Sequence, residues 1–264
     1  MTKLKSTVLQ ALILTKNEEP NLKRVLDKLT WLEKVVIVDS GSTDATLAIA
    51  ATYENVEVDY RAFDSFAQQC NYGLTLLDSE WVLSLDSDYV LTDDFIEETK
   101  KFVNSGDQKN AYATSFKFVV FGKPLLTDNT TPRPVLFRRS AGSYFNDGHA
   151  HRLAVEGEVG AYQSYILHDD RKPLSRWLSN QDGYSVKECT KLMEESGGKL
   201  PLSGKIRKTK VLAPFMVFFY SLFIKGLIFN GWRGWHYVLQ RTMVEIVIAL
   251  RLIEEEKLKK DLEG

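Results

Sequence analysis

Two carboxylates stand two residues apart in the run Leu85-Asp86-Ser87-Asp88, at the end of an apolar segment. In an extended backbone, residues i and i+2 point to the same side, so Asp86 and Asp88 are expected to lie next to each other. Neighbouring carboxylates repel each other unless a cation lies between them. Oxygen ligands suit Mg2+ or Mn2+, and a diphosphate can complete the coordination shell. The pair predicts a metal site, although an Asp-x-Asp run alone is also common in solvated turns.

Two further polar clusters follow apolar runs earlier in the chain. Thr15, Asn17 and Glu18 come after the run 8–14, and Asp39 follows the run 34–38. Nearly continuous apolar runs of this length are typical of strands that are covered on both faces. Segments with helical spacing of apolar residues follow each run, at 17–29 and up to about residue 53. Such alternation predicts parallel strands joined by crossover helices.

The same alternation continues for another fifty residues. We expect strands at 55–60 and 80–85, and helices at 66–77 and 92–102. In an open parallel sheet, ligands bind beyond the carboxyl ends of the strands. The three polar clusters are therefore expected on one edge of the sheet. One polar strand end is ordinary capping chemistry, whereas three together predict a binding site.

The order of predicted strands and helices changes in the second half of the chain. Strands are expected at 111–121, 133–139 and 162–167, and a helix at 173–195. Apolar helical segments follow at 211–229 and 236–253. We therefore expect an α/β domain at 1–172 and a helical C-terminal region at 173–264.

The composition sets broad limits on the class of protein. The chain has 264 residues, of which 44% are hydrophobic and 26% charged, so it can bury a large core and is not expected to be disordered. A formal net charge of -1 argues against a general nucleic-acid binder. Cys70 and Cys189 stand in no metal-ligand spacing, which fits a reducing compartment.

Three motifs together resemble the family 2 glycosyltransferases. They are Ile13-Leu14-Thr15-Lys16-Asn17-Glu18, Val36-Ile37-Val38-Asp39-Ser40-Gly41-Ser42-Thr43-Asp44 and Val82-Leu83-Ser84-Leu85-Asp86-Ser87-Asp88. The chain is most similar to the bacterial branch that includes the lipopolysaccharide-core glucosyltransferases. The resemblance implies the GT-A fold, a Rossmann-like α/β arrangement with a mostly parallel sheet and flanking helices, here with an added C-terminal helical segment. It also implies transfer of a sugar from a nucleotide-sugar donor with inversion at the sugar carbon, UDP being the commonest nucleotide.

The resemblance implies donor-binding roles in all three clusters. Asp39 would hydrogen-bond the nucleobase. Asp86 would approach the ribose and the metal, and Asp88 would ligate the metal directly. The other donor contacts would come from Thr15, Asn17 and Glu18, and from Gln69 and Asn71 of a Gln-x-Asn pattern.

Inverting transfer needs a general base that deprotonates the attacking hydroxyl. In the resembling enzymes, the region that corresponds to 144–153 carries a His-Glu pair whose Glu would be the base. Here the pair reads His151-Arg152, and an arginine cannot accept a proton at neutral pH. Arg152 is suited instead to bind a phosphate of the donor or of a lipid-linked acceptor. The replacement candidates are Asp147 first, then His149 or His151 as a neutral imidazole, and Glu156 as a more distant option.

A fourth polar cluster, His168 to Lys172, follows the strand expected at 162–167. It is suited to a second metal or phosphate contact, and equally to a plain polar loop before the next helix.

The C-terminal region is cationic and apolar. Between Gly197 and Val244 there is no Asp or Glu, whereas eight Lys or Arg occur. The segment 213–229 is slightly short for a membrane span, and Trp232, Arg233 and Trp235 follow it. We expect a peripheral membrane contact through 205–235, with attraction to anionic headgroups. A helical hairpin packed on the catalytic domain, or a homo-oligomer contact, is the alternative.

These observations predict a glycosyltransferase that uses Mg2+ or Mn2+ and acts on a lipid-linked or cell-envelope glycan at the cytoplasmic face of the cell membrane. Two alternatives stay open. A nucleotidyltransferase can also use paired Asp residues, but it needs a Gly-rich basic phosphate loop where this chain has Thr15-Lys16-Asn17-Glu18-Glu19. A non-catalytic protein that retains the donor pocket is compatible with the His151-Arg152 departure.

Overall fold

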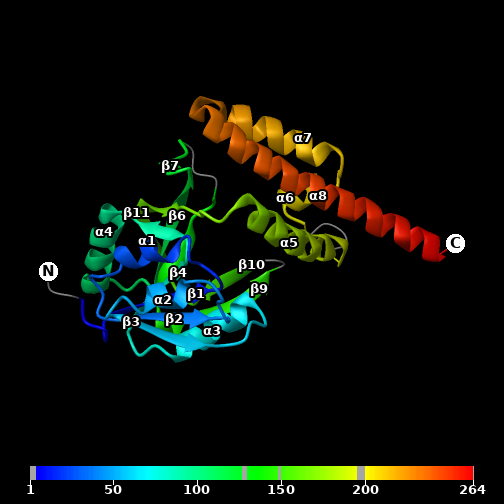
Figure 1. Ribbon diagram of the computed structural model, residues 1–264. Helices are drawn as coiled ribbons and strands as arrows, with labels where there is room; N and C mark the ends of the chain where they lie inside the picture. The colour runs from blue at the N-terminus through cyan, green and yellow to red at the C-terminus, as the bar shows by residue number, and fades with distance from the viewer. Residues whose placement is uncertain (1–3, 127–129, 148–149, 195–199, 264) are drawn as a thin grey trace. The chain divides into compact units, whose positions relative to one another are not determined.

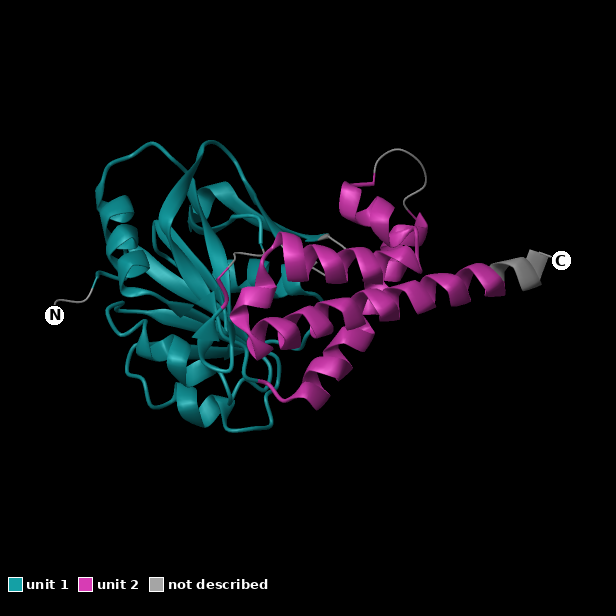
Figure 2. Ribbon diagram, turned by 90° about the horizontal axis from the view of Figure 1, so that it is seen from above, with its two compact units in different colours: residues 1–124, 128–171 teal, residues 125–127, 172–264 magenta. Residues whose placement is uncertain are grey.

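The computed structural model describes residues 4–126, 130–147, 150–194 and 200–263. The chain forms two compact units, which Figure 2 shows in different colours. The first unit contains residues 1–124 and 128–171, and the second contains residues 125–127 and 172–264.

The first unit is built on a nine-stranded mixed sheet with the order β3-β2-β1-β4-β8-β6-β11-β5, in which β7 pairs with β6 (Figure 1). The strands β1, β2, β3 and β4 are parallel to one another, and β6 and β11 run in the same direction. The strands β5, β7 and β8 run the opposite way. The bounds are β1 Leu9–Thr15, β2 Val35–Asp39, β3 Val56–Tyr60, β4 Trp81–Asp86, β5 Tyr89–Leu91, β6 Ala111–Val120, β7 Lys123–Pro124, β8 Arg133–Arg138 and β11 Val159–His168. The α/β class with a mostly parallel sheet is confirmed.

Alternate side chains of β1 enter two separate cores, one on each face of the sheet. Leu9 and Ile13 are fully buried in a core that includes residues of α1 (Leu22–Asp27) and α4 (Asp93–Asn104). Leu12 is buried in the other core, on the side of α3 (Phe66–Thr75). Gly73 of α3 lies so close to Leu12 that a Cβ atom on it would overlap the leucine side chain. Because both faces are covered, β1 and β2 read as apolar runs in the sequence.

Two of the expected helices are shorter in the structure than the spacing of apolar residues predicted. The helix expected at 17–29 is confined to α1, and the one expected up to residue 53 is α2 (Thr46–Ala50). Asn17 has a left-handed φ of 56°, which a continuing α-helix does not allow. Its backbone N–H donates to the Ser42 hydroxyl at 2.7 Å. The polar residues before α1 therefore bond to the neighbouring turn and do not extend the helix.

A separate two-stranded sheet is formed by β9 (Gly142–Asp147) and β10 (Ala150–Val155), which are antiparallel. The sequence pattern did not predict these strands. It predicted only that 144–153 contains candidate catalytic residues.

The second unit is helical. It consists of α5 (Leu174–Glu194), α6 (Leu202–Arg207), α7 (Leu212–Phe219), the π-helical turn η2 (Tyr220–Ile224), the short helix η3 (Leu227–Asn230) and α8 (Trp232–Glu263). The apolar segment 211–229 is not one helix, because Gly226 turns the chain with a φ of 68°. In the part of the chain that the structure describes, we find no helix with the length and apolar character of a membrane span.

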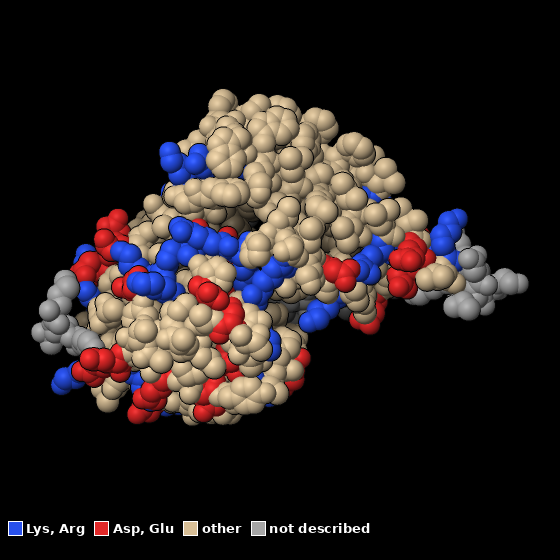
Figure 3. Space-filling model, viewed as in Figure 1, with Lys and Arg blue, Asp and Glu red and all other residues tan. Residues whose placement is uncertain are grey.

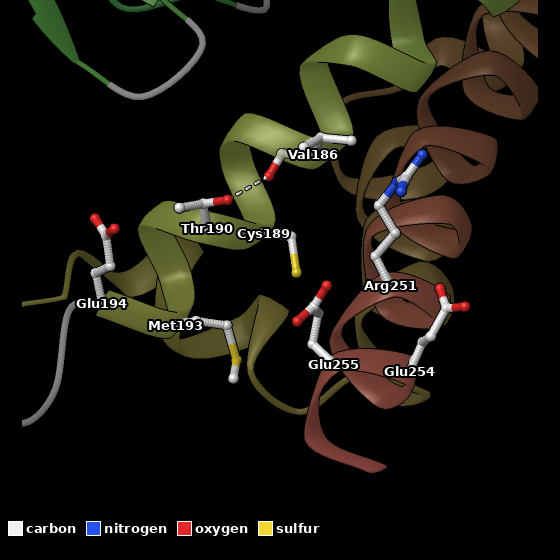
Figure 4. A pocket seen from close by; sticks show the side chains of 8 residues that line it. All are labelled: Val186, Cys189, Thr190, Met193, Glu194, Arg251, Glu254 and Glu255. Atoms are coloured by element: carbon white, nitrogen blue, oxygen red, sulfur yellow. Dashed lines mark hydrogen bonds between the residues drawn. The ribbon is translucent and has the colours of Figure 1, made fainter. Parts of the chain in front are cut away.

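A pocket of about 320 Å³ lies between α5 and α8 (Figure 4). Cys189 and Met193 line it from α5, and Arg251, Glu254 and Glu255 line it from α8. None of the residues predicted for donor, metal or acceptor binding belongs to this pocket, so it is not the candidate site.

A largely buried ion cluster joins three helices of this second unit. The Arg207 guanidinium donates to the Glu245 carboxylate at 2.9 to 3.2 Å and to Glu188 Oε1 at 2.5 Å. Only 3% of the Glu245 side chain and 12% of the Glu188 side chain are exposed. Burial acts to lower the pKa of Arg207, but hydrogen bonds and charges from Glu245 and Glu188 raise it overall. The guanidinium therefore stays charged and ties α6 to α5 and α8.

We predict that Glu245→Gln destabilises the helical unit strongly, because it leaves a buried guanidinium with incomplete charge compensation. The expected loss is about 3 to 5 kcal/mol in the free energy of unfolding. Denaturant unfolding followed by circular dichroism measures it. The matched control is Glu57→Gln, which removes the more exposed Lys34–Glu57 pair and should cost at most about 1 kcal/mol. Equal losses in the two variants would contradict the role of the cluster.

Candidate active site

The carboxyl ends of three parallel strands lie level with one another. Thr15 at the end of β1 pairs with Asp39 at the end of β2. On the other side of β1, Leu14 pairs with Asp86 at the end of β4. The structure therefore brings together Thr15, Asp39 and Asp86, as the sequence pattern predicted for one edge of the sheet.

The Asp39 carboxylate organises the turn after β2. Its Oδ2 accepts hydrogen bonds from the hydroxyls of Thr15 at 2.8 Å and Ser42 at 2.5 Å. Its Oδ1 accepts from the backbone N–H groups of Gly41 and Ser42, both at 2.8 Å. Burial would raise the pKa of Asp39, but these hydrogen bonds, those from Ser42 first, lower it overall. Asp39 is thus held as a carboxylate at the position where the nucleobase contact is predicted.

The loop after β1 is bonded to the same turn. Lys16 Nζ donates to the carbonyl oxygens of Ser40 and Gly41 at 2.7 and 2.8 Å. The backbone N–H of Thr43 donates to Asn17 Oδ1 at 2.6 Å. Gly41 has a φ of 85°, which favours glycine at this point of the turn. The two loops therefore form one hydrogen-bonded wall of the site.

Asn21 connects this wall to the loop that follows β11. The Asn21 side chain is fully buried and donates to Glu18 Oε2 at 3.0 Å and Asp170 Oδ1 at 2.9 Å. It also accepts from the backbone N–H of Arg171 at 2.9 Å. Arg24 of α1 donates to the carbonyl of Asp169 at 2.7 Å. Sequence reasoning missed Asn21, because its partners at 170 and 171 are about 150 residues away.

The end of β11 lies beside the second aspartate of the Asp-x-Asp run. His168 Nε2 is 3.3 Å from Asp88 Oδ2, and the N–H of Asp169 donates to the Asp88 carbonyl at 2.9 Å. Burial acts to lower the pKa of His168, but the charge of Asp88 and its hydrogen bond raise it overall. The cluster expected at 168–172 is therefore placed next to Asp88, as its possible metal role requires.

Asp86 has its own buried neighbours. The Tyr89 hydroxyl, which accepts from Arg133 Nη2 at 3.1 Å, lies within the electrostatic influence of Asp86. Burial, and then the charge of Asp86, raises the pKa of Tyr89 well above its usual value. Tyr89 therefore stays a neutral phenol beside the Asp86 carboxylate.

The local chemistry fits a divalent cation that receives further ligands from a bound molecule. Carboxylate oxygens such as those of Asp86 and Asp88 suit Mg2+ or Mn2+, whereas an imidazole suits other transition metals better. Within the described ranges, no group of three His, Cys, Asp or Glu side chains is placed so that it could hold a metal ion. A cation here would need oxygen atoms from a diphosphate or from water.

Gln69 and Asn71 of α3 bond to other parts of the protein. Gln69 is fully buried and donates to the Ser40 hydroxyl at 3.3 Å and to the carbonyls of Arg61 and Ala62 at 3.0 Å. It therefore supports the Asp39 turn from behind.

Asn71 pairs with the backbone of Tyr144 in β9. Its Nδ2 donates to the Tyr144 carbonyl and its Oδ1 accepts from the Tyr144 N–H, both at 2.8 Å. The Tyr144 hydroxyl donates to Ser84 of β4 at 2.7 Å. Together these bonds hold the β9–β10 hairpin near the end of β4. Direct contacts of Gln69 and Asn71 with a donor remain predictions.

Two of the candidate general bases, Asp147 and His151, belong to the strands of this hairpin. In the backbone, Asp147 pairs with Ala150 and His151 pairs with Asn146. The side chains of Asp147 and His151, and the whole of His149, lie outside the described part of the structure.

Two other candidates from this region lie on described parts of the hairpin. Arg152 is exposed on β10, opposite Phe145. Glu156 follows the far end of β10, where Val155 pairs with Gly142. Six strand residues span about 20 Å, so the structure does not bring Glu156 together with Asp147.

We predict that Asp39→Asn reduces stability in a pH-dependent manner. The pKa of Asp39 is lowered in the folded state, so the carboxylate stabilises the fold at neutral pH. That contribution is lost as the pH falls below about 4 and through the lowered folded-state pKa. The variant should lose about 1 to 3 kcal/mol at pH 7, and the loss should shrink towards pH 2. Thermal unfolding at a series of pH values measures this, with the exposed Glu54→Gln as the control. A loss that does not change with pH would contradict the prediction.

The comparisons with known proteins agree with this geometry. The family model described as glycosyl transferase family 2 matches residues 11–146, about half of the chain. The lipopolysaccharide core biosynthesis glycosyltransferase LpsC of Rhizobium meliloti is 24% identical over 259 residues, which cover 95% of this chain and 94% of that protein. An uncharacterized glycosyltransferase of Rickettsia bellii is 26% identical over 134 residues, 50% of this chain and 44% of that protein.

Among solved structures, the chain is similar to S. aureus TarS 1-349 in complex with UDP-GlcNAc. The TM-score is 0.49 with 17% sequence identity, over 90% of this chain and 81% of that chain. The family model spans β1, β2 and β4, whose ends carry Thr15, Asp39 and Asp86. The resemblance stated from the three motifs is confirmed: the chain belongs to glycosyl transferase family 2, with the GT-A type of α/β fold.

Proposed function

We propose that this glycosyltransferase moves a sugar from a UDP-sugar donor, with inversion, to a lipid-linked or cell-envelope glycan. The observation that carries the proposal is that Asp39 and Asp86 end the two strands on either side of β1 within one residue of the same level, and that Asp88, two residues after Asp86, lies 3.3 Å from His168. This arrangement offers a place for the nucleoside near Asp39 and a place for the diphosphate near Asp88, at the same edge of the sheet. The similarity to a relative named for lipopolysaccharide core biosynthesis supports the class of acceptor.

The donor would lie across the rim with its base at the Asp39 turn. Thr15, Asn17 and Glu18 would form the wall beside the nucleoside, and Asp86 would reach the ribose. Asp86 and Asp88 would hold Mg2+ or Mn2+ together with oxygen atoms of the diphosphate, with His168 beside Asp88. The cation supplies positive charge that stabilises the leaving diphosphate. Because Asn21 bonds to Glu18, Asp170 and the backbone of Arg171, this wall of the site is held in place without a donor.

The acceptor would approach from the tip of the β9–β10 hairpin. Asp147 is the proposed general base that accepts the proton of the attacking hydroxyl, and His149 and His151 are its alternatives. Arg152 would bind a phosphate of the donor or of the acceptor. The Asn71–Tyr144 pair supports this assignment, because it holds the hairpin close to the strand that ends in Asp86.

The proposed place of action is the cytoplasmic face of the cell membrane, through a peripheral contact of residues 205–235. Aromatic side chains in this range are exposed in the second unit, among them Phe215, Phe229 and Trp232. A membrane contact would bring the enzyme to a lipid-linked acceptor.

A screen of nucleotide-sugars tests the donor. Thermal unfolding with Mn2+ present should show one donor that raises the melting temperature by mass action. Transfer releases a nucleoside diphosphate, whereas a nucleotidyltransferase would release pyrophosphate from a nucleoside triphosphate. A protein that binds a nucleotide-sugar but turns over no acceptor pool would be the non-catalytic alternative.

We predict that Asp88→Asn reduces sugar transfer at least about 100-fold, because it removes a metal ligand. The same variant should lose the Mn2+-dependent part of the thermal stabilisation by UDP. Asp94→Asn, an equal change of charge on exposed α4, is the control and should keep both. Full activity of Asp88→Asn would show that the metal role is wrong.

We predict that Asp147→Asn lowers transfer by about 10² to 10⁴-fold while donor affinity is kept, because a base acts only on the acceptor hydroxyl. The candidate bases are separated by measuring transfer rates and UDP affinity by titration calorimetry. Both measurements are made on Asp147→Asn and on the single variants His149→Gln and His151→Gln. Unchanged transfer in Asp147→Asn would assign the base to a histidine or to Glu156.

A further inference from the structure

The helical hairpin of α7 and α8 has an apolar face that the second unit leaves exposed. Phe215, Phe219 and Phe223 are each more than half exposed, and Phe229 is 81% exposed. Figure 3 shows this area in the upper part of the view as a broad surface with few charged side chains. A soluble monomer rarely exposes a large continuous apolar patch, so the face indicates a contact with another phase or molecule.

One side of α8 continues the same face. Its exposed apolar residues follow spacings of three and four, which place them on a single stripe. The stripe consists of Trp232, Trp235, Leu239, Met243, Ile246 and Leu250. The opposite side of α8 is buried, with Ile248 and Leu252 packed against residues of α5. Helical spacing alone favours a core-facing or partner-facing position for Leu239, Met243, Ile246 and Leu250, and the structure leaves these four side chains exposed.

The types of side chain favour a lipid surface as the occupant. Phenylalanine and tryptophan dominate the face, and tryptophan is enriched at the boundary between acyl chains and headgroups. Arg233 lies over the ring of Trp232 at 4.5 Å, and Lys225 lies near the ring of Tyr220 at 5.9 Å. An interfacial helix combines an apolar face with cations at its edge in this way.

A second copy of the chain fits the face less well. A helix pair formed through the α8 stripe would use a narrow seam, usually flanked by charged residues of opposite sign. Beside the middle of the stripe lie Gln240, Thr242 and Val247, which are all uncharged, and the charged neighbour Arg233 lies at its first residue, Trp232. The exposed surface also extends beyond such a seam onto α7, which a two-helix contact would not cover.

Some of the cations in this region are used inside the unit. Arg207 is bonded to Glu188 and Glu245, and Lys210 forms an ion pair with Glu256. The positive charges of Arg207 and Lys210 are therefore already compensated within the unit and are not available to lipid headgroups. This weakens the attraction to anionic headgroups that the acid-free sequence suggested, and leaves apolar contact as the main contribution.

We propose that α7, η2, η3 and the Trp232–Leu250 stripe of α8 lie flat in the headgroup boundary of a lipid bilayer, held mainly by apolar insertion. The inference rests on the proposed membrane contact of 205–235 and extends it along α8 to Leu250. The contact is one-sided, because the other side of the hairpin is buried against its own unit.

Vesicle flotation of the full chain tests the proposal. The wild type should bind phosphatidylcholine vesicles, and should keep that binding between about 0.1 M and 1 M salt, because apolar insertion is not screened. Phe215→Ser/Phe219→Ser/Phe223→Ser should lower the partition coefficient at least about 100-fold. The matched control is Leu174→Ser/Leu178→Ser/Val186→Ser, which removes three exposed apolar side chains from α5 and should bind as the wild type does.

Three results would overturn the proposal. If the Phe215→Ser/Phe219→Ser/Phe223→Ser variant bound vesicles as strongly as the wild type, this face would not be the membrane contact. Binding only to vesicles with phosphatidylglycerol, lost at high salt, would assign the contact to charge. A wild type that binds neither kind of vesicle but is dimeric, with the α7 variant monomeric by light scattering, would assign the face to a second copy. Stabilisation by UDP and Mn2+ is measured on every variant, so that a failure of the membrane contact is distinguished from a failure of the donor site.

Discussion

Parallel hydrogen bonding on both sides of β1 sets the level at which three loops leave the sheet. Thr15 is in register with Asp39, and Leu14 with Asp86, so the two aspartates stand one residue apart along β1, and a shift in either ladder would change that offset. The apolar side chains of β1 enter cores on both faces, which makes such a shift costly. The position of the polar residues therefore follows from the packing of apolar ones.

Hydrogen bonds between loops then convert this alignment into a site. Asp39 holds the turn after β2, and Asn21 joins the loop after β1 to the loop after β11. Carboxylates dominate this edge of the sheet, and several have a cationic or titratable neighbour, such as Arg24 beside Asp169 and His168 beside Asp88. Negative charge can be concentrated here because these neighbours offset part of the repulsion. A bound cation would offset the remaining repulsion and the negative charge of a diphosphate.

Much of this arrangement could be predicted from the sequence, because strand ends and turn residues are local signals. The apolar runs before Thr15, Asp39 and Asp86 identified the strands and their common edge. The contact of His168 with Asp88 was not predicted, since the two residues are 80 positions apart and are brought together by the pairing of β11 with β5. The sequence did not indicate that Asn21 joins two loops, because any asparagine just before a helix is expected to be its N-cap.

The stripe on α8 shows a different limit of sequence reasoning. Helical spacing states which residues share a face, but it does not state whether another element covers that face. The shortening of the helix expected at 17–29 has a third cause. Polar residues of this segment bond to a turn that lies 25 residues further along the chain.

The β9–β10 hairpin forms its own small sheet, and the described contacts that anchor it include the paired bonds of Asn71 with the Tyr144 backbone and the bond from the Tyr144 hydroxyl to Ser84. Two of these three bonds use main-chain atoms of the hairpin, which every amino acid at position 144 other than proline would supply. The tip can therefore accumulate substitutions, insertions or deletions without loss of its attachment. Enzymes that share this donor rim could in this way diverge in the molecule they glycosylate, and the hairpin is a natural unit to exchange between them when a new specificity is engineered.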